Sequence, residues 1–281
     1  MVVIITKFNL RLWDKDKNGN STNGDEWLEE RFHLFEEFCL PSLMCQTYKD
    51  FIWLVLFDNK TPDKWRKKVD EFEHNCPQLY PCFLSEKETK EQTLYVKEQI
   101  RKLYKGDGSL ITIRLDNDDA ICADFVNSIM SVADQQRENL CCYSFPWGIQ
   151  YYTTGRLAMK IPYINNHFLV LVNKHFNPNE DFGIISQYNH YFHHKFPFPF
   201  VSLEYYTSPM WAEVIHERNV DNDCKMTIRQ CCIGRKSYMR ERFGWKVELS
   251  IVHNLWTLPF FLFPRFCQQF WRRFRDKMRK Q

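Results

Sequence analysis

The stretch Ser109-Leu110-Ile111-Thr112-Ile113-Arg114-Leu115-Asp116-Asn117-Asp118-Asp119 decides the fold. Its first seven residues form an apolar, β-branched run that predicts a buried strand. Three carboxylates then fall within four residues, and such groups repel one another unless a hard cation lies among them. The stretch therefore predicts a strand whose end, the acidic turn at residues 116–119, holds a divalent metal. The alternative is a solvated turn in which Asp118 or Asp119 caps the next helix.

Two further apolar runs precede this strand, at residues 2–5 and 51–57. Neither alternates with polar residues, which is typical of parallel strands covered on both faces. Helical patterns separate or follow these strands, and they cover residues 26–39, 61–73, 86–105 and 120–133. This alternation predicts an α/β fold with a mostly parallel sheet. Ligands bind such sheets beyond the carboxyl ends of the strands, so we expect Asn9, Asp58 and the acidic turn at one rim.

The second half of the chain is less regular. Its patterns predict strands at residues 141–150, 168–172 and 211–215, a helix at 181–194, and a loop rich in Pro and Phe at 196–200.

The composition excludes several classes of protein. With 44% hydrophobic and 26% charged residues, the 281-residue chain is typical of a globular protein. No run reaches the ~20 apolar residues of a membrane-spanning helix, and the N-terminus does not resemble a secretory signal, so we expect a cytoplasmic protein. The eleven cysteines include no Cys-x-x-Cys pair. We expect reduced thiols rather than disulfides or a zinc site.

Charge is uneven along the chain. Residues 264–281 include seven basic residues and one acidic residue, which leaves 31 basic and 34 acidic residues elsewhere, with no nucleic-acid footprint. Aromatic side chains repeat every four residues at Phe266, Phe270 and Phe274, and basic side chains cover the other faces. This pattern predicts an amphipathic helix through which residues 255–281 bind the anionic, cytoplasmic face of a membrane. The alternative is that the aromatic face packs on the body or on a partner protein.

Two charged residues near the strand ends have two interpretations each. Arg114 can reach a diphosphate, or it can form a structural salt bridge with the acidic turn. Asp58 can accept hydrogen bonds from a base or ribose, or it can cap the helix that follows Pro62.

Three motifs resemble family 2 glycosyltransferases, in the order in which that family has them. They are Thr6-Lys7-Phe8-Asn9, the stretch from Pro41 to Asp58 (PSLMCQTYKDFIWLVLFD), and Leu115-Asp116-Asn117-Asp118-Asp119. The run RLDNDDA at residues 114–120 and the late segment 211–219 are similar to the family called "Putative rhamnosyl transferase". One departure is Asp58-Asn59-Lys60-Thr61, where family 2 often has Asp-Asp-Gly-Ser, so contacts to the base are expected to differ.

The resemblance implies a GT-A fold, which is Rossmann-like with helices on both faces of the sheet, and a nucleotide-diphosphate sugar donor. It also implies Mn²⁺ or Mg²⁺ as cofactor, bound by Asp116, Asp118 and His216. The donor-binding residues that it implies are Thr6, Phe8, Asn9, Asp58, Arg114, Asp116, Asn117 and Asp119.

The catalytic base is sought among carboxylates, because an inverting transferase must deprotonate an acceptor hydroxyl. Glu180-Asp181 resembles the Glu-Asp pair that opens a helix in family 2. Asp181, with Glu180 beside it, is the preferred candidate, and Glu204 is the next. Adjacent carboxylates at a helix start are also ordinary complements of the helix dipole.

The resulting hypothesis is a metal-dependent glycosyltransferase that moves a sugar, with rhamnose suggested by the resemblance, to a glycan or lipid-linked glycan in surface polysaccharide synthesis. We expect a glycosyltransferase domain at 1–250, divided into a nucleotide-binding half at 1–135 and an acceptor-binding half at 136–250, and a membrane-associating tail at 251–281. One alternative is a nucleotidyltransferase, although residues 6–14 lack its glycine-rich phosphate loop. The other is a catalytically silent, membrane-bound scaffold for glycan assembly.

Overall fold

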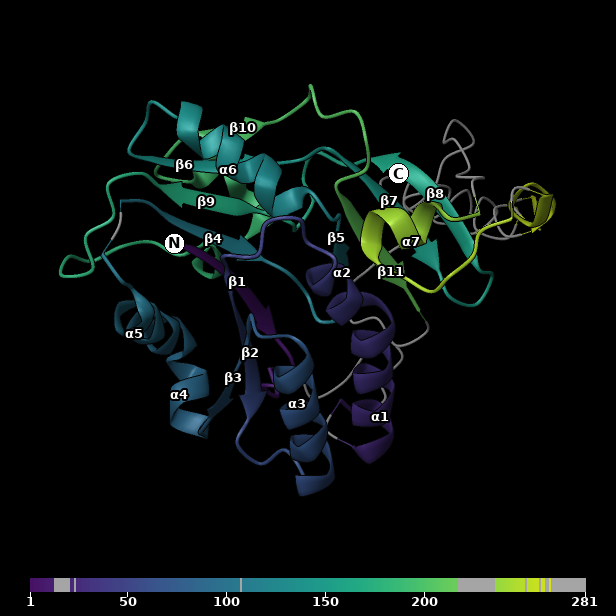
Figure 1. Cartoon of the computed structure of the whole chain (residues 1–281), viewed down its shortest axis with the longest axis horizontal. Helices are drawn as coiled ribbons and strands as arrows, with labels where there is room; N and C mark the ends of the chain where they lie inside the picture. The colour runs from purple at the N-terminus through teal and green to yellow at the C-terminus, as the bar shows by residue number, and fades with distance from the viewer. Residues whose placement is uncertain are drawn as a thin grey trace, which may run out of the picture.

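A computed structural model describes residues 1–12, 21–22, 24–106, 108–216, 236–250, 252–257, 259–260 and 263. Seven strands form the main sheet, in the order β10-β6-β9-β4-β1-β2-β3, and four form a second sheet, in the order β5-β11-β7-β8. Figure 1 shows helices α4 and α5 on one side of strands β1 to β3, and α1 and α3 on the other. The α/β fold with a mostly parallel sheet is therefore confirmed.

The first four strands along the chain all belong to the main sheet and run parallel to one another. They are β1 (Val2–Lys7), β2 (Ile52–Asp58), β3 (Leu79–Leu84) and β4 (Leu110–Arg114). Three of them were expected from their apolar runs. Strand β3 was not, because its sequence LYPCFL contains Pro81. Proline lacks a backbone N–H and is tolerated on an edge strand, which is the position of β3.

Helices connect these strands and cover both faces of the sheet. They are α1 (Asp25–Leu34), the π-helical turn η1 (Phe35–Cys39), α2 (Leu40–Met44), α3 (Asp63–Asn75), α4 (Glu86–Lys90), α5 (Gln92–Leu103) and α6 (Phe125–Gln135). The helix expected at 86–105 is two helices, since α4 ends before Glu91. The helix expected at 120–133 begins only at Phe125, because Ala120 and Ile121 pair as strand β5.

One antiparallel strand determines which later residues reach the acidic turn. Strand β9 (Val170–Asn173) runs antiparallel to both β4 and β6 (Leu140–Ser144), so Val170 lies opposite Ile113 at the acidic-turn end of β4. Residues just before β9 therefore lie near the acidic turn, and residues just after it start at the opposite edge. Strand β10 (Phe200–Ser202) pairs parallel with β6.

The second sheet positions the late histidine. Strand β11 (Trp211–Ile215) pairs with β5 (Ala120–Ile121) and with β7 (Trp147–Tyr152), which also pairs with β8 (Leu157–Pro162). Strand β11 was expected, and its pairing with β5 ties its start to the segment that follows the acidic turn. The strand expected at 141–150 is wrong as a single element, because it divides into β6 and β7.

The helix expected at 181–194 is also wrong. The chain forms two short 3-10 segments there, Ile185–Gln187 and His190–Lys195, and both lie in a stretch rich in aromatic and polar residues. The last labelled helix is α7 (Tyr238–Phe243). The main sheet takes strands from both sides of residue 135, and the proposed domain boundaries stay a prediction. Most of the tail predicted at 251–281, namely residues 251, 258, 261–262 and 264–281, lies outside the described residues, as do residues 217–219 of the late segment 211–219.

Candidate functional site

The acidic turn lies at the carboxyl end of β4, beside the end of β1. Arg114 of β4 pairs in register with Ile5 of β1, two residues before Lys7. The Arg114 guanidinium contacts Asp116 through Nε at 3.3 Å from Oδ1 and Nη2 at 3.2 Å from Oδ2. The Asp116 side chain remains 39% exposed. One carboxylate of the turn therefore remains accessible to solvent while it is paired with a cation, Arg114.

Lys7 is a second cation at this rim. Burial and the positive charge of Arg114 lower the pKa of Lys7, and Asp116 acts in the opposite direction. Although burial opposes it, Arg114 and His167 hold the pKa of Asp116 below its ordinary value. Two cations beside one accessible carboxylate match what an anionic diphosphate and its counter-ion require.

Asp119 is buried and joins three segments. Its Oδ2 lies 2.7 Å from His167 Nε2, and its Oδ1 accepts a hydrogen bond of 2.9 Å from the backbone N–H of Val214 on β11. Burial raises the pKa of Asp119 to about 7. Burial opposes protonation of His167, but its hydrogen bond to Asp119 raises the pKa of His167 above the ordinary value.

Asp118 points to the other side of the turn. Its Oδ2 lies 2.7 Å from Nη1 of Arg31 on α1 and 3.0 Å from Nε2 of His216 at the end of β11. The other ring nitrogen of His216 lies 3.4 Å from Glu30 Oε1. Although burial opposes it, Arg31 and His216 hold the pKa of Asp118 well below its ordinary value. The predicted pair of Asp118 and His216 is thus brought together, with Arg31 as a third member.

Among the described residues, one group of three side chains fits a divalent metal, and Asp118 with His216 is a second pair of potential ligands. Ligand atoms of Asp116, Asp119 and His167 lie within 4.8 Å of one another. Octahedral Mg²⁺ with ligands at about 2.1 Å places neighbouring ligands roughly 3 Å apart and opposite ones roughly 4.2 Å apart. The separations from His167 Nε2, 2.7 Å to Asp119 and 3.8 Å to Asp116, fall near this range. The 3.0 Å between Asp118 and His216 also fits neighbouring ligands.

Asn9 and Asp58 meet at the same rim, beyond the ends of β1 and β2. Asn9 Oδ1 accepts a hydrogen bond from the backbone N–H of Asp58, and its Nδ2 donates to Thr61 Oγ1. Asp58 accepts from the backbone N–H of Lys60 and pairs with Arg11. The Asp58 carboxylate therefore closes its own turn and does not cap α3, whose N-cap residue, Pro62, makes no side-chain cap bond.

Asn117 connects the turn to β1, and the remaining predicted donor-binding residues lie beneath the rim. Asn117 Nδ2 donates to the carbonyl oxygen of Phe8, while the Phe8 ring packs among aromatic rings, 4.6 Å from that of Phe32. Thr6 is buried and accepts a hydrogen bond from Trp53 Nε1. Thr6 and Phe8 therefore support the rim with side chains directed into the core. Their predicted contact with the donor stays a prediction.

The predicted base candidates lie in different places. The Asp181 side chain is 89% exposed, and its Oδ1 lies 2.7 Å from Lys97 Nζ on α5. Glu180 accepts a hydrogen bond from Asn177. In the described parts of the chain, no contact joins either carboxylate to the acidic turn. Glu204 follows β10, and the backbone N–H of its neighbour Leu203 bonds to Ser144 at the end of β6. The catalytic roles stay predictions.

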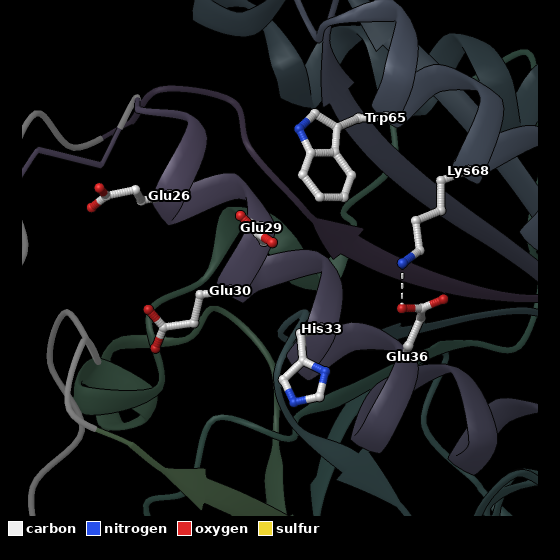
Figure 2. Close-up of a pocket in the computed structure, with 7 residues that line it drawn as sticks. All are labelled: Glu26, Glu29, Glu30, His33, Glu36, Trp65 and Lys68. Carbon is white, nitrogen blue, oxygen red and sulfur yellow. Dashed lines mark ion pairs between the residues drawn. The ribbon is translucent and has the colours of Figure 1, made fainter.

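A groove of about 630 Å³ lies between α1 and α3, beside the site. Figure 2 shows that acidic side chains of α1 line it together with Trp65 and Lys68 of α3, and that Lys68 is paired with Glu36 of η1, at 2.5 Å. Glu30 lines this groove and also contacts His216. The groove is therefore connected to the acidic turn through one histidine.

Arg31, His167 and Lys7 were missed from the sequence. Arg31 carried a signal, because it falls on the apolar stripe of α1, four residues after Trp27 and three after Leu28, where a charge is unexpected. Lys7 lies inside the motif Thr6-Lys7-Phe8-Asn9, of which only the other three residues were predicted to contact the donor. His167 reaches the turn only because β9 is antiparallel, and no local pattern indicates that.

Comparisons with solved structures give weak similarity. A chain of S. aureus TarS 1-349 in complex with UDP-GlcNAc is 17% identical, with a TM-score of 0.31, and covers 51% of this chain and 34% of that one. TarS 1-349 is 12% identical with a TM-score of 0.41, covering 76% and 60%. A 4-diphosphocytidyl-2C-methyl-D-erythritol synthase is 9% identical with a TM-score of 0.32, covering 72% and 88%. The chain thus spans about a third to three fifths of these TarS chains.

Comparison with curated protein sequences gave no match. The match to a family of sequences is extensive, because residues 16–228 fit the family described as "Putative rhamnosyl transferase". That range includes β2, β4, the acidic turn, His167 and β11. With its α/β fold and mostly parallel sheet, the chain belongs to the glycosyltransferase family called "Putative rhamnosyl transferase".

Proposed function

We propose that this chain is a metal-dependent glycosyltransferase that transfers a sugar from a nucleotide-diphosphate donor. Rhamnose is the sugar to test first, because of the family, and the acceptor is a glycan or lipid-linked glycan of a surface polysaccharide. The observation that carries the proposal is the acidic turn with one exposed carboxylate, Asp116, beside the cations Arg114 and Lys7. A buried turn with a purely structural role does not require an accessible carboxylate with two cations near it.

The residues at the rim suggest how the chain would bind such a donor. Arg114 and Lys7 would bind the diphosphate, and their fixed charges would offset the charge that develops as the diphosphate leaves. A divalent ion, Mn²⁺ or Mg²⁺, would add further charge stabilisation when held by Asp116 with His167, or by Asp118 with His216. Asn9 and Asp58, which fix each other at the ends of β1 and β2, would face the nucleoside.

The test is release of nucleoside diphosphate from a panel of nucleotide sugars, measured with Mn²⁺ and with EDTA. Asp116→Asn should lower the metal-dependent rate at least about 100-fold, the scale of losing one charge-stabilising group at a reacting centre. The matched control is Glu73→Gln, because Glu73 is an exposed carboxylate on α3. Equal rates in Asp116→Asn and the control would refute the proposed role of the turn. Release of inorganic pyrophosphate from a nucleoside triphosphate and a sugar phosphate would indicate a nucleotidyltransferase instead.

We also propose that the C-terminal region attaches the protein to the cytoplasmic face of a membrane. The described residues just before the basic tail expose large apolar side chains: Val252, Leu255, Trp256, Phe260 and Phe263. On the same segment, His253 bonds to the carbonyl oxygen of Gly155 and Asn254 is buried, so one side contacts the body while the other is apolar and open. No helix among the described residues is long and apolar enough to cross a membrane.

Vesicle sedimentation tests this attachment. Binding to anionic vesicles should exceed binding to neutral ones and weaken with salt. Trp256→Ser should reduce it, because the Trp256 side chain is 75% exposed. Equal binding to neutral and anionic vesicles, or none to either, would contradict the proposal.

A further inference from the structure

Arg31 is a buried cation at the centre of the site. It is 5% exposed, although it lies on a surface helix, α1. Its Nη1 lies 2.7 Å from Asp118 Oδ2 and 3.4 Å from Asn117 Oδ1, and its guanidinium lies 5.2 Å from the ring centre of Trp27. The side chain is therefore directed inward to the acidic turn, and it meets Asp118, a residue 87 positions later in the chain.

Burial of the Arg31 charge is unfavourable unless other groups in the protein compensate it. Taking a guanidinium out of water costs several kcal/mol unless a buried partner compensates it, so a surface helix gains little from an inward arginine by itself. One charged partner here is an oxygen of Asp118, and the same oxygen also contacts His216 Nε2 at 3.0 Å. The protein's own donors thus occupy the Asp118 oxygen that contacts His216, the oxygen in reach of a metal bound between these two residues.

We propose that Arg31 is a positioning residue that serves as an internal counter-ion for Asp118 and competes with divalent metal for that carboxylate. The proposal rests on the proposed metal-dependent function. When no metal is bound, Arg31 holds Asp118 charged and directed away from Asp116. When metal binds at Asp118 and His216, the guanidinium gives up this contact. Metal affinity at the site is therefore lower than its carboxylates alone would provide.

The geometry predicts a specific coupling between two side chains. Without Arg31, the Asp118 carboxylate is buried with only His216 as a cationic partner among the described contacts, and the folded state is destabilised. Removal of the Asp118 charge in the same chain removes that penalty. The effects of the two substitutions on stability should therefore be strongly non-additive, as for residues in direct contact.

The experiment uses the full chain and Mn²⁺ alone as probe. Thermal unfolding is measured in EDTA and in saturating Mn²⁺, and Mn²⁺ binding is measured by electron paramagnetic resonance. The variants are Arg31→Met, Arg31→Lys, Asp118→Asn and the double variant Arg31→Met/Asp118→Asn. Arg240→Met is the control, because Arg240 is an exposed arginine on α7.

We expect Arg31→Met to melt at a lower temperature in EDTA, to bind Mn²⁺ about tenfold more tightly, and to gain more stability from Mn²⁺ than the unsubstituted chain. Arg31→Lys should restore part of the metal-free stability, and the double variant should melt above Arg31→Met. Arg240→Met should match the unsubstituted chain. A purely structural arginine would lower the melting temperature without changing Mn²⁺ affinity.

Unchanged Mn²⁺ affinity in Arg31→Met, or additive effects in the double variant, would overturn the proposal. If Arg31→Met does not fold, the double variant and Arg31→Lys carry the same comparison. If the unsubstituted chain binds no Mn²⁺ but Arg31→Met does, the competition is supported while the proposed metal-dependent activity fails. If neither binds Mn²⁺, both fail.

Discussion

The substitution Asp119→Asn tests how the acidic turn is held in place. Asp119 is fully buried, with one oxygen 2.7 Å from His167 Nε2 and the other bonded to the backbone N–H of Val214. One carboxylate thus fixes the turn to the segment before β9 and to β11, two residues before His216. Its loss should loosen both histidines at once.

The magnitude follows from these contacts. Asparagine has nearly the same shape and can still accept the hydrogen bond from Val214, so the main loss is the charge-assisted bond to His167. Hydrogen bonds to charged groups contribute about 1.5–3 kcal/mol, so the free energy of unfolding should fall by about 2 kcal/mol near pH 6. The buried position leaves little screening by water to reduce this value.

The loss has a definite pH dependence. The hydrogen bond to Asp119 raises the pKa of His167 although burial opposes it. His167 binds its proton more tightly when folded, so this stabilisation is fully present below the unfolded pKa of the histidine and is lost as the pH rises through the folded one. The unsubstituted chain should therefore lose stability between pH 6 and pH 8, and Asp119→Asn should lose less.

Urea unfolding followed by tryptophan fluorescence, in EDTA at pH 6 and pH 8, measures both quantities. The variants His167→Gln and Asp119→Asn/His167→Gln complete a double-mutant cycle. The same fall in stability from pH 6 to pH 8 in Asp119→Asn as in the unsubstituted chain would refute the reasoning. So would a double variant whose loss equals the sum of the single losses.

Three further predictions test other parts of the molecule. Gly148→Ala should destabilise the folded protein by at least about 2 kcal/mol, because an added Cβ would lie 2.2 Å from the Trp211 ring. Gly24→Ala is the comparison, because an added Cβ there meets open space. Thermal unfolding of the two variants should show the larger loss of stability in Gly148→Ala. His167→Ala and His216→Ala should each weaken Mn²⁺ binding if both metal positions are used. Calorimetric titration measures the loss of Mn²⁺ affinity in each variant. Unchanged Mn²⁺ affinity in both variants would contradict both positions. Glu204→Gln should slow sugar transfer more than Asp181→Asn, since Asp181 is exposed and paired with Lys97. An inactive Asp181→Asn variant beside an active Glu204→Gln variant would instead favour Asp181 as the catalytic base.

The sequence predicted the parts of this fold that local patterns determine. Strands β1, β2 and β4 are apolar on both faces, so their runs identify them without knowledge of their partners. Their parallel order then brings Asn9, Asp58 and the acidic turn to one rim. Strand β3 was missed because Pro81 is compatible with a strand only at an edge, and edge position is a property of the whole sheet.

The partners of each carboxylate depend on contacts between distant segments, which one sequence does not reveal. Asp118 was predicted to meet His216, and it does, because β11 ends beside the turn. The partners Arg31 and His167 lie 87 and 48 positions from Asp118 and Asp119, respectively. Arg31 was detectable in principle as a charge on an apolar stripe, but nothing in the sequence indicates which carboxylate it meets.

The direction of β9 also bears on the catalytic base. The Glu-Asp resemblance at residues 180–181 assumes that the chain after this strand continues toward the donor. Because β9 runs antiparallel to β4, it carries the chain away from the acidic turn, and Asp181 instead meets Lys97. Strand β10 runs parallel to β6 and ends at the acidic-turn edge, three strands from β4, or roughly 14 Å at 4.8 Å per strand. An acceptor sugar fits within that distance, so strand direction favours Glu204, which follows β10, over Asp181 as the carboxylate that meets the acceptor.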